Sequence, residues 1–242
     1  MISDIIELLR GNPYPGRGII IGCSRCGQKS IVVYFIMGRS VNSRNRIFEQ
    51  TRDGIRTAAY DPAKLTDPSL VIYNPVRIMN DCIVVTNGDQ TDTIYDYIND
   101  GSDFYNALQS REFEPDAPNY TPRISGLVQM DGSYHLSILK TVSSIPIACQ
   151  RNFYEYSSAI PGLGHFISTY ETDGDPLPSF SGDPIPIYID DSIGLKGFLS
   201  NIWDALDDEN KVSIYAHERD LSTGEINHLV FNHPCREFPD LF

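Results

Sequence analysis

Two apolar runs near the start of the chain constrain its fold more than any other feature. Residues 18–22 (GIIIG) and 31–37 (IVVYFIM) each have the length of a strand, and a polar turn that contains glycine separates them. The pattern predicts a β-hairpin that is buried on one or both faces. A second hairpin is predicted around residues 131–133 (DGS), between strands at 123–130 and 134–140.

The rest of the chain continues this pattern. Further strands are predicted at residues 55–60, 69–73, 76–79, 82–86, 145–154, 165–171, 212–217 and 226–231. Apolar residues at helical spacing predict helices over 1–10 and 195–206, and two more within 91–110, where Gly101 interrupts the pattern. Many hairpins with few, segregated helices indicate an α+β fold, with two sheets packed as a sandwich and covered by helices. We expect a single domain over residues 1–242, because composition does not divide the chain into halves.

Charge and hydropathy exclude several classes of function. The formal charge of −13 argues against nucleic acid as a partner, because a phosphate backbone requires a broad basic surface. No run approaches the ~18 apolar residues of a membrane span, and the first ten residues lack the order of a signal peptide. The sequence therefore predicts a soluble protein without a membrane partner.

Cysteine and arginine usage add two further constraints. Five cysteines at irregular positions indicate a reducing, cytoplasmic compartment. Cys23 and Cys26 have CxxC spacing, but without a second pair of ligands they read more simply as two thiols at a strand end than as a metal site. Arg39, Arg44 and Arg46 crowd into one short segment. Arginine grips phosphate and carboxylate in a planar, bidentate way, so this cluster indicates either an anion pocket or a solvated loop that balances nearby acids.

Four segments carry the polar residues that a nucleotide site would need. In residues 85–94 a strand leads into Asn87-Gly88 and then a helix start, where backbone N–H groups and the Thr91 hydroxyl suit a phosphate. Residues 112–124 hold carboxylates, an amide and an arginine in a loop stiffened by prolines. Residues 69–78 place Tyr73 at a predicted strand end, and residues 167–171 end another strand. Taken singly, each segment also fits an ordinary turn, a solvated loop or core packing.

Taken together, in order and at their separations, these segments resemble the archaeal-type IMP cyclohydrolase family over about residues 16–172. The matching stretches are Gly16-Arg17, Arg39-Ser40 with Arg44, Tyr73-Asn74 with Arg77-Ile78, Asn87-Gly88 with Thr91-Asp92-Thr93-Ile94, Glu114 with Asp116, Asn119 and Thr121-Pro122-Arg123-Ile124, and Ile167-Ser168-Thr169-Tyr170-Glu171. The resemblance implies an αββα sandwich like that of N-terminal-nucleophile hydrolases, used without their nucleophile. It also implies conversion of 5-formamidoimidazole-4-carboxamide ribonucleotide to IMP and water in purine biosynthesis. A small purine nucleotide is then the partner, with no cofactor and no metal, and we expect a homo-oligomer.

The same resemblance implies roles for single residues. The predicted catalytic residues are Arg44, Tyr73 and Glu114. The predicted substrate-binding residues are Arg17, Arg39, Arg46, Asn74, Arg77, Asn87, Gly88, Thr91, Asp92, Asn119 and Arg123. In the expected mechanism Arg17 and Arg44 contact anions, Tyr73 donates to the formyl oxygen and Glu114 takes or relays the amide proton. Asn87, Gly88 and Thr91 hold phosphate or ribose, and Arg123 supports Glu114.

Two departures from the family pattern leave alternatives open. Gln90 stands where the family usually has histidine, and two extra residues in the arginine loop leave Arg44 and Arg46 competing for one role. A non-catalytic purine-nucleotide-binding protein is therefore one alternative. An amidohydrolase of the N-terminal-nucleophile type is another, which requires processing to expose a Ser, Thr or Cys. The proline- and glycine-rich loop at residues 174–186 has a length at which loops often serve as lids.

Overall fold

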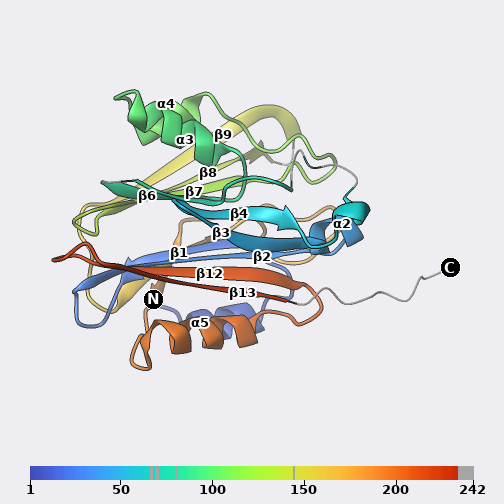
Figure 1. Ribbon diagram of the computed structural model, residues 1–242. Helices are drawn as coiled ribbons and strands as arrows, with labels where there is room; N and C mark the ends of the chain where they lie inside the picture. The colour runs from blue at the N-terminus through green and yellow to red at the C-terminus, as the bar shows by residue number, and fades with distance from the viewer. Residues whose placement is uncertain (66–67, 69–70, 80, 144, 234–242) are drawn as a thin grey trace.

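The computed structural model describes residues 1–242 except 66–67, 69–70, 80, 144 and 234–242. Its strands form two antiparallel sheets that lie face to face, and helices cover the outer face of each sheet (Figure 1). This arrangement confirms the predicted α+β sandwich and makes it an αββα stack of layers. No helix among the described residues is long and apolar enough to span a membrane.

One sheet has six strands and the other has seven. The six-stranded sheet has the spatial order β11 (Ile185–Tyr188), β10 (Leu163–Ser168), β1 (Arg17–Cys23), β2 (Lys29–Met37), β12 (Lys211–Asp220) and β13 (Ile226–Asn232). The seven-stranded sheet has the order β3 (Arg46–Thr51), β4 (Gly54–Ala59), β5 (Val76–Ile78), β6 (Cys82–Thr86), β7 (Arg123–Gln129), β8 (Tyr134–Val142) and β9 (Ile145–Tyr156).

The helices divide between the two outer faces. The six-stranded sheet is covered by α1 (Ile5–Arg10) and α5 (Gly194–Ala205), whereas α3 (Gln90–Asn99) and α4 (Phe104–Gln109) cover the seven-stranded sheet (Figure 1). Between α3 and α4, Gly101 has φ +79°, a conformation that glycine adopts without strain and that ends the helix where the sequence predicts an interruption. Two short elements complete the set, α2 (Val41–Arg44) and a 3-10 turn (Pro62–Lys64).

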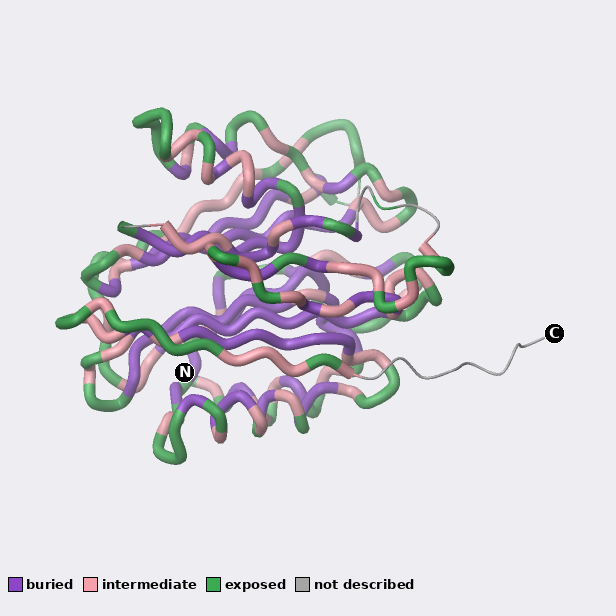
Figure 2. Tube along the Cα trace, in the orientation of Figure 1, coloured by how far each residue is buried: buried purple, intermediate pink, exposed green. Residues whose placement is uncertain are grey.

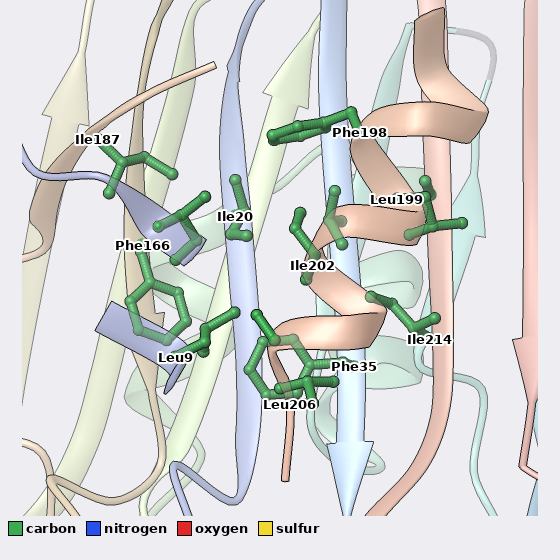
Figure 3. Close-up of a cluster of buried hydrophobic side chains, with 14 of the residues drawn as sticks. Leu9, Ile20, Phe35, Phe166, Ile187, Phe198, Leu199, Ile202, Leu206 and Ile214 are labelled. Atoms are coloured by element: carbon green, nitrogen blue, oxygen red, sulfur yellow. The ribbon is translucent and has the colours of Figure 1, made fainter. Parts of the chain in front are cut away.

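The central hairpin is buried on both faces, which explains its unbroken apolar sequence. Successive strand residues point to opposite faces. Ile19, Ile21 and Tyr34 therefore enter the core between the sheets, while Ile20 and Phe35 pack beneath α1 and α5 (Figure 3). Figure 2 shows this burial as continuous purple along the inner strands, with exposed residues at the loops and outer helix faces.

Two expectations of secondary structure were wrong, and one strand was not predicted. Of the strand predicted at residues 69–73, Ser69 and Leu70 lie outside the described residues, and the rest is a loop because the Pro68 carbonyl accepts from the N–H groups of Val71 and Ile72 in a turn. Residues 46–51, for which no element was predicted, form β3 through pairing with β4. The loop predicted to extend to Pro186 ends in β11, an edge strand of the kind that tolerates proline.

Candidate active site

A pocket of about 240 Å³ lies where β1 begins and β2 ends. Its charged lining consists of three guanidinium groups and one carboxylate: Arg17, Arg39, Arg46 and Asp116. The protein as a whole carries a formal charge of −13, so the pocket concentrates positive charge inside an acidic molecule. A larger cavity of about 470 Å³ between α1, α5 and the β10–β11 edge contains none of the predicted site residues.

Two of these arginines have buried nitrogen atoms without partners. Arg17 Nε and Arg46 Nη1 have no hydrogen-bond partner among the described residues, although Arg46 is buried and the Arg17 side chain is only 12% exposed. Burial lowers the pKa of the Arg46 guanidinium, and the neighbouring Arg17 lowers it further. A buried donor or cation without a partner is costly, so these two side chains are prepared for an anionic ligand.

Glu114 is buried beside Arg17. One of its carboxylate oxygens lies 3.8 Å from Arg17 Nη2. Burial raises the pKa of Glu114, although Arg17 and Arg123 partly oppose that effect. The pKa of Arg17 is raised, because Glu114 and nearby tyrosines outweigh the opposing effect of burial. A carboxyl group with a raised pKa beside an anion site has the properties of a general acid or base.

Tyr73 joins this site through a second tyrosine. Its hydroxyl lies 2.8 Å from the hydroxyl of Tyr34, and both side chains are buried. Burial, followed by the interaction with Tyr73, raises the pKa of Tyr34 well above its ordinary value. Both tyrosines act electrostatically on Arg46 and raise the pKa of its guanidinium, against the effects of burial and of Arg17. The hydroxyl pair therefore lies close enough to the arginines of the pocket to interact with them.

The Asn87-Gly88 turn supports the site from behind. Asn87 donates to the Pro122 carbonyl and accepts from Gln90 and from the Ile124 N–H, so its polar atoms have partners. Gln90 Oε1 in turn accepts from Arg123 Nη1 at 2.6 Å. A Cβ atom on Gly88 would lie 2.5 Å from Arg123 Nη1 and 3.4 Å from Glu114 Oε1. A side chain at this position would therefore have to displace the ends of the Arg123 and Gln90 side chains, which the turn approaches closely.

The predicted residues thus fall into separate groups. Arg17, Arg39, Arg46 and Asn119 line the pocket. Glu114 and Tyr73 interact with its arginines, and Arg123 lies behind Glu114. The Thr91 hydroxyl bonds to Thr86 and the Gly88 carbonyl. Three others form a cluster of their own, in which Asp92 accepts from Asn74 and Arg77.

Arg44 lies outside the pocket lining. Its guanidinium donates to the Gly38 carbonyl and to Asn210 Oδ1, and so ties α2 to the loop before β12. Arg46, only two residues later, begins β3 and turns into the pocket. Of the two arginines that the sequence left in competition, Arg46 is the one that the structure brings to the predicted site.

Sequence reasoning assigned no role to several residues of the site. Tyr14, Tyr170 and Asp116 line the pocket, and Tyr34 bonds to Tyr73. Tyr34 was hidden inside an apolar run that reads as core. Asp116 and Tyr170 belong to matching stretches of the family pattern, which was the available signal.

The loop predicted at residues 174–186 runs along the pocket. Leu177 lines the pocket and its N–H donates to Asn119 Oδ1 at 3.0 Å. Arg39 donates to Asp173 and to the Gly174 carbonyl. This segment is therefore one wall of the site, held by two of the predicted binding residues. A lid function remains a prediction.

The described cysteines show no sign of a metal site. Cys23, Cys26, Cys82 and Cys149 are free thiols. Within the described residues, no three His, Cys, Asp or Glu side chains gather as metal ligands would.

Gly16 allows Tyr170 to reach the pocket, and its replacement should be costly. Gly16 has φ +77°, and a Cβ atom there would lie 2.5 Å from the Tyr170 ring. Gly16→Ala is expected to lower the free energy of unfolding by more than ~3 kcal/mol in denaturant titration. Gly101→Ala is the matched control, because Gly101 has φ +79° with open space around it, and should cost only the ~1–2 kcal/mol of the left-handed backbone. Equal losses would show that close packing of Gly16 is unimportant.

Fold and pocket together define an αββα sandwich protein with an arginine-lined pocket. Residues 14–224 match the model of a family described as IMP cyclohydrolase-like protein. Because this match covers most of the chain, the chain belongs to the IMP cyclohydrolase-like family.

Individual relatives agree with the family match. The chain is 30% identical to an IMP cyclohydrolase of Methanosphaera stadtmanae over 162 residues, which cover 65% of this chain and 74% of the relative. It is 35% identical to an IMP cyclohydrolase of Methanothrix thermoacetophila over 119 residues, or 48% of this chain and 57% of that protein. It is 37% identical to an IMP cyclohydrolase of Methanopyrus kandleri over 46% of this chain and 57% of that protein.

Proposed function

We propose that this chain is an IMP cyclohydrolase, which closes the ring of 5-formamidoimidazole-4-carboxamide ribonucleotide to give IMP and water. The observation that carries the proposal is the buried Glu114 carboxyl group, with its raised pKa, beside arginines whose nitrogen atoms lack partners. The family and the relatives named above support the reaction.

The reaction demands little covalent chemistry from the protein. The carboxamide nitrogen attacks the formyl carbon of the same molecule and loses one proton. The former formyl oxygen then leaves as water with that proton and the proton of the formamido nitrogen, which forms the C=N bond of the ring. Holding the two reacting groups in line can lower the barrier by ~7–11 kcal/mol. What remains is a donor for the developing oxyanion and an acceptor for the amide proton.

The geometry suggests which side chains take these roles. In our proposal Glu114 takes the amide proton, since its raised pKa brings it nearer to that of a useful base at neutral pH. Tyr73 donates to the formyl oxygen, with Tyr34 fixing its hydroxyl at 2.8 Å. Arg17 and Arg46 bind anionic groups through the nitrogen atoms that lack partners. Arg46 thus takes the role first considered for Arg44.

The remaining predicted residues then act indirectly. Asn87 accepts from Gln90, Gln90 accepts from Arg123, and the charge of Arg123 lowers the pKa of Glu114 against the effect of burial. We propose that these hydrogen bonds position Arg123, whose charge then acts on the catalytic carboxyl group. The cluster of Asn74, Arg77 and Asp92 would fix the start of α3, because Asp92 lies in its first turn.

A turnover assay tests the proposal. Purified protein is mixed with the formylated carboxamide nucleotide, and IMP is followed by chromatography against a reaction without protein. The expected result is protein-dependent formation of IMP. If the nucleotide binds without turnover, the non-catalytic purine-nucleotide-binding protein replaces this proposal. An intact mass that shows processing to a new Ser, Thr or Cys terminus would favour the amidohydrolase.

Several wider properties are also proposals. We propose a single domain, because the family match runs from 14 to 224 across both sheets. A cytoplasmic location is supported by the free thiols of the described cysteines. A homo-oligomer is supported by the long edge strand β9, where Ile145 and Ile147 are exposed.

A further inference from the structure

We propose that Asp116 and Tyr170 form a hydrogen-bond acceptor corner in the pocket, which recognises the ribose hydroxyl groups of the nucleotide. Thr121 is a positioning residue, because its hydrogen bonds determine that the corner accepts hydrogen bonds instead of donating them. The inference rests on the proposed function, because it assumes that the ligand is a nucleotide. It adds a determinant of sugar specificity to a site otherwise described by its anion contacts.

The corner is a short chain of hydrogen bonds. Thr121 donates twice to the Asp116 carboxylate, from its N–H at 2.6 Å and from its hydroxyl at 2.5 Å. The Thr121 oxygen lies 2.5 Å from the Tyr170 hydroxyl. Asp116 and Tyr170 both line the pocket, whereas Thr121 is completely buried behind them.

The chemistry of these three groups fixes the direction of the chain. An ionised carboxylate only accepts hydrogen bonds, and a threonine hydroxyl has a single proton. Because Thr121 gives that proton to Asp116, it accepts the proton of Tyr170. Burial raises the pKa of Tyr170 to about 12, so the phenol keeps its proton at neutral pH. The Tyr170 oxygen therefore offers a lone pair, and not a proton, to a ligand.

The rest of the pocket has the opposite character. Arg17 Nε and Arg46 Nη1 are donors without partners, and Asn119 uses its oxygen to accept from Leu177, which leaves its amide protons as donors. An anion fits the donors, and a hydroxyl group that donates fits the Asp116–Tyr170 corner. A 5′-nucleotide carries both on one sugar, as phosphate and ribose hydroxyls.

The size and rigidity of the site agree with a sugar phosphate. Its volume of about 240 Å³ is below the ~300–1,000 Å³ usual for pockets that enclose a whole ligand, so it suits part of a nucleotide. Tyr170 is held by stacking on Tyr14, with ring centroids 5.9 Å apart, and by contact with Gly16. The carboxamide is left to Glu114, whose backbone N–H donates to the Thr121 carbonyl.

Calorimetric binding of IMP, 2′-deoxy-IMP and 3′-deoxy-IMP tests the inference. IMP has no open carboxamide, so these ligands isolate recognition of the sugar. The parent protein is expected to bind IMP about tenfold more tightly than at least one deoxy analogue, as for the loss of one hydrogen bond. Tyr170→Phe and Thr121→Val should lower the ratio of the affinities, and Thr121→Ser should keep it near that of the parent. Inorganic phosphate should bind the parent and Tyr170→Phe with equal affinity.

The outcomes separate this inference from the proposed function. Equal affinity of the parent for all three ligands, with IMP still formed in the assay, overturns the acceptor corner and leaves the enzyme intact. A preference for IMP that is undiminished in Tyr170→Phe and Thr121→Val also overturns it. Failure of every nucleotide to bind, with no IMP formed, removes both proposals. If the variants do not fold, equal affinity of the parent protein for the three ligands still overturns the inference.

Discussion

Glu114→Gln is expected to reduce the rate of IMP formation by about 10²-fold or more, because glutamine cannot accept the amide proton. The side chain keeps its size and its place beside Arg17, so binding of IMP should change much less than turnover. Glu112→Gln is the matched control, since Glu112 lies two residues away on an exposed part of the same loop. Its turnover should equal that of the parent protein.

The pH profile gives a second measurement on the same residue. Burial raises the pKa of Glu114 above its ordinary 4.5, so the basic form, and with it kcat/KM, should be lost as pH falls through that raised pKa. The free energy of unfolding changes in the opposite direction. Folding favours the protonated form of Glu114, so the stability that Glu114 contributes at low pH is lost as pH rises through its folded pKa. Glu114→Gln should therefore be at least as stable as the parent protein at neutral pH. A variant with normal turnover and an unchanged acidic limb would remove Glu114 from the mechanism.

Arg46→Met is expected to weaken nucleotide binding by about 100-fold, or ~2.7 kcal/mol. The guanidinium is buried with Nη1 unpartnered, and an anionic ligand would supply the missing partner. Its other nitrogen atoms donate to the carbonyl groups of Ser43 and Met37. Loss of those two hydrogen bonds destabilises the fold, whereas removal of a buried charge stabilises it. The two effects oppose each other, so the free energy of unfolding should change by less than ~2 kcal/mol. Calorimetry with IMP and denaturant titration measure the two effects.

Two other arginines provide the comparison. Arg44→Met tests the alternative first considered, and its effect on affinity should be small because Arg44 bonds to Gly38 and Asn210. Arg56→Met on the paired strand β4 removes an exposed charge that pairs with Glu49, and should leave affinity unchanged. An affinity loss in Arg44→Met that exceeds the loss in Arg46→Met would reverse the assignment.

Much of the fold was predictable because its signals are local. The hairpin at residues 18–37 reads as two apolar runs, since both faces of each strand are buried. Gly101 interrupts the helical pattern where α3 ends. By contrast, β3 was missed because its sequence RIFEQT is short, with charges at Arg46 and Glu49 and no regular alternation, and only pairing with β4 makes it a strand. β11 is likewise stabilised by β10 and by a bridge to Ser3, which a local pattern does not reveal.

The site was less predictable than the fold for the same reason. The family pattern brought Arg17, Tyr73 and Glu114 into consideration, and they do lie near one another. It could not separate Arg44 from Arg46, because only the end of α2 decides which one turns inward. Nor could it reveal that the side chain of Asn87 forms hydrogen bonds with the backbone of residues 122–124. Such partners come from tertiary packing and leave no trace in spacing.

The pocket lies where the two sheets meet. Arg17 and Tyr34 come from the six-stranded sheet, whereas Arg46 starts a strand of the seven-stranded sheet, and Glu114 and Tyr73 belong to loops next to it. Because the arginines of the pocket come from both sheets, the pocket exists only while the two sheets are packed together. The rate of catalysis should thus depend on how the two sheets are aligned with each other. Loosening the interface between the sheets should therefore abolish turnover well before the chain loses its secondary structure.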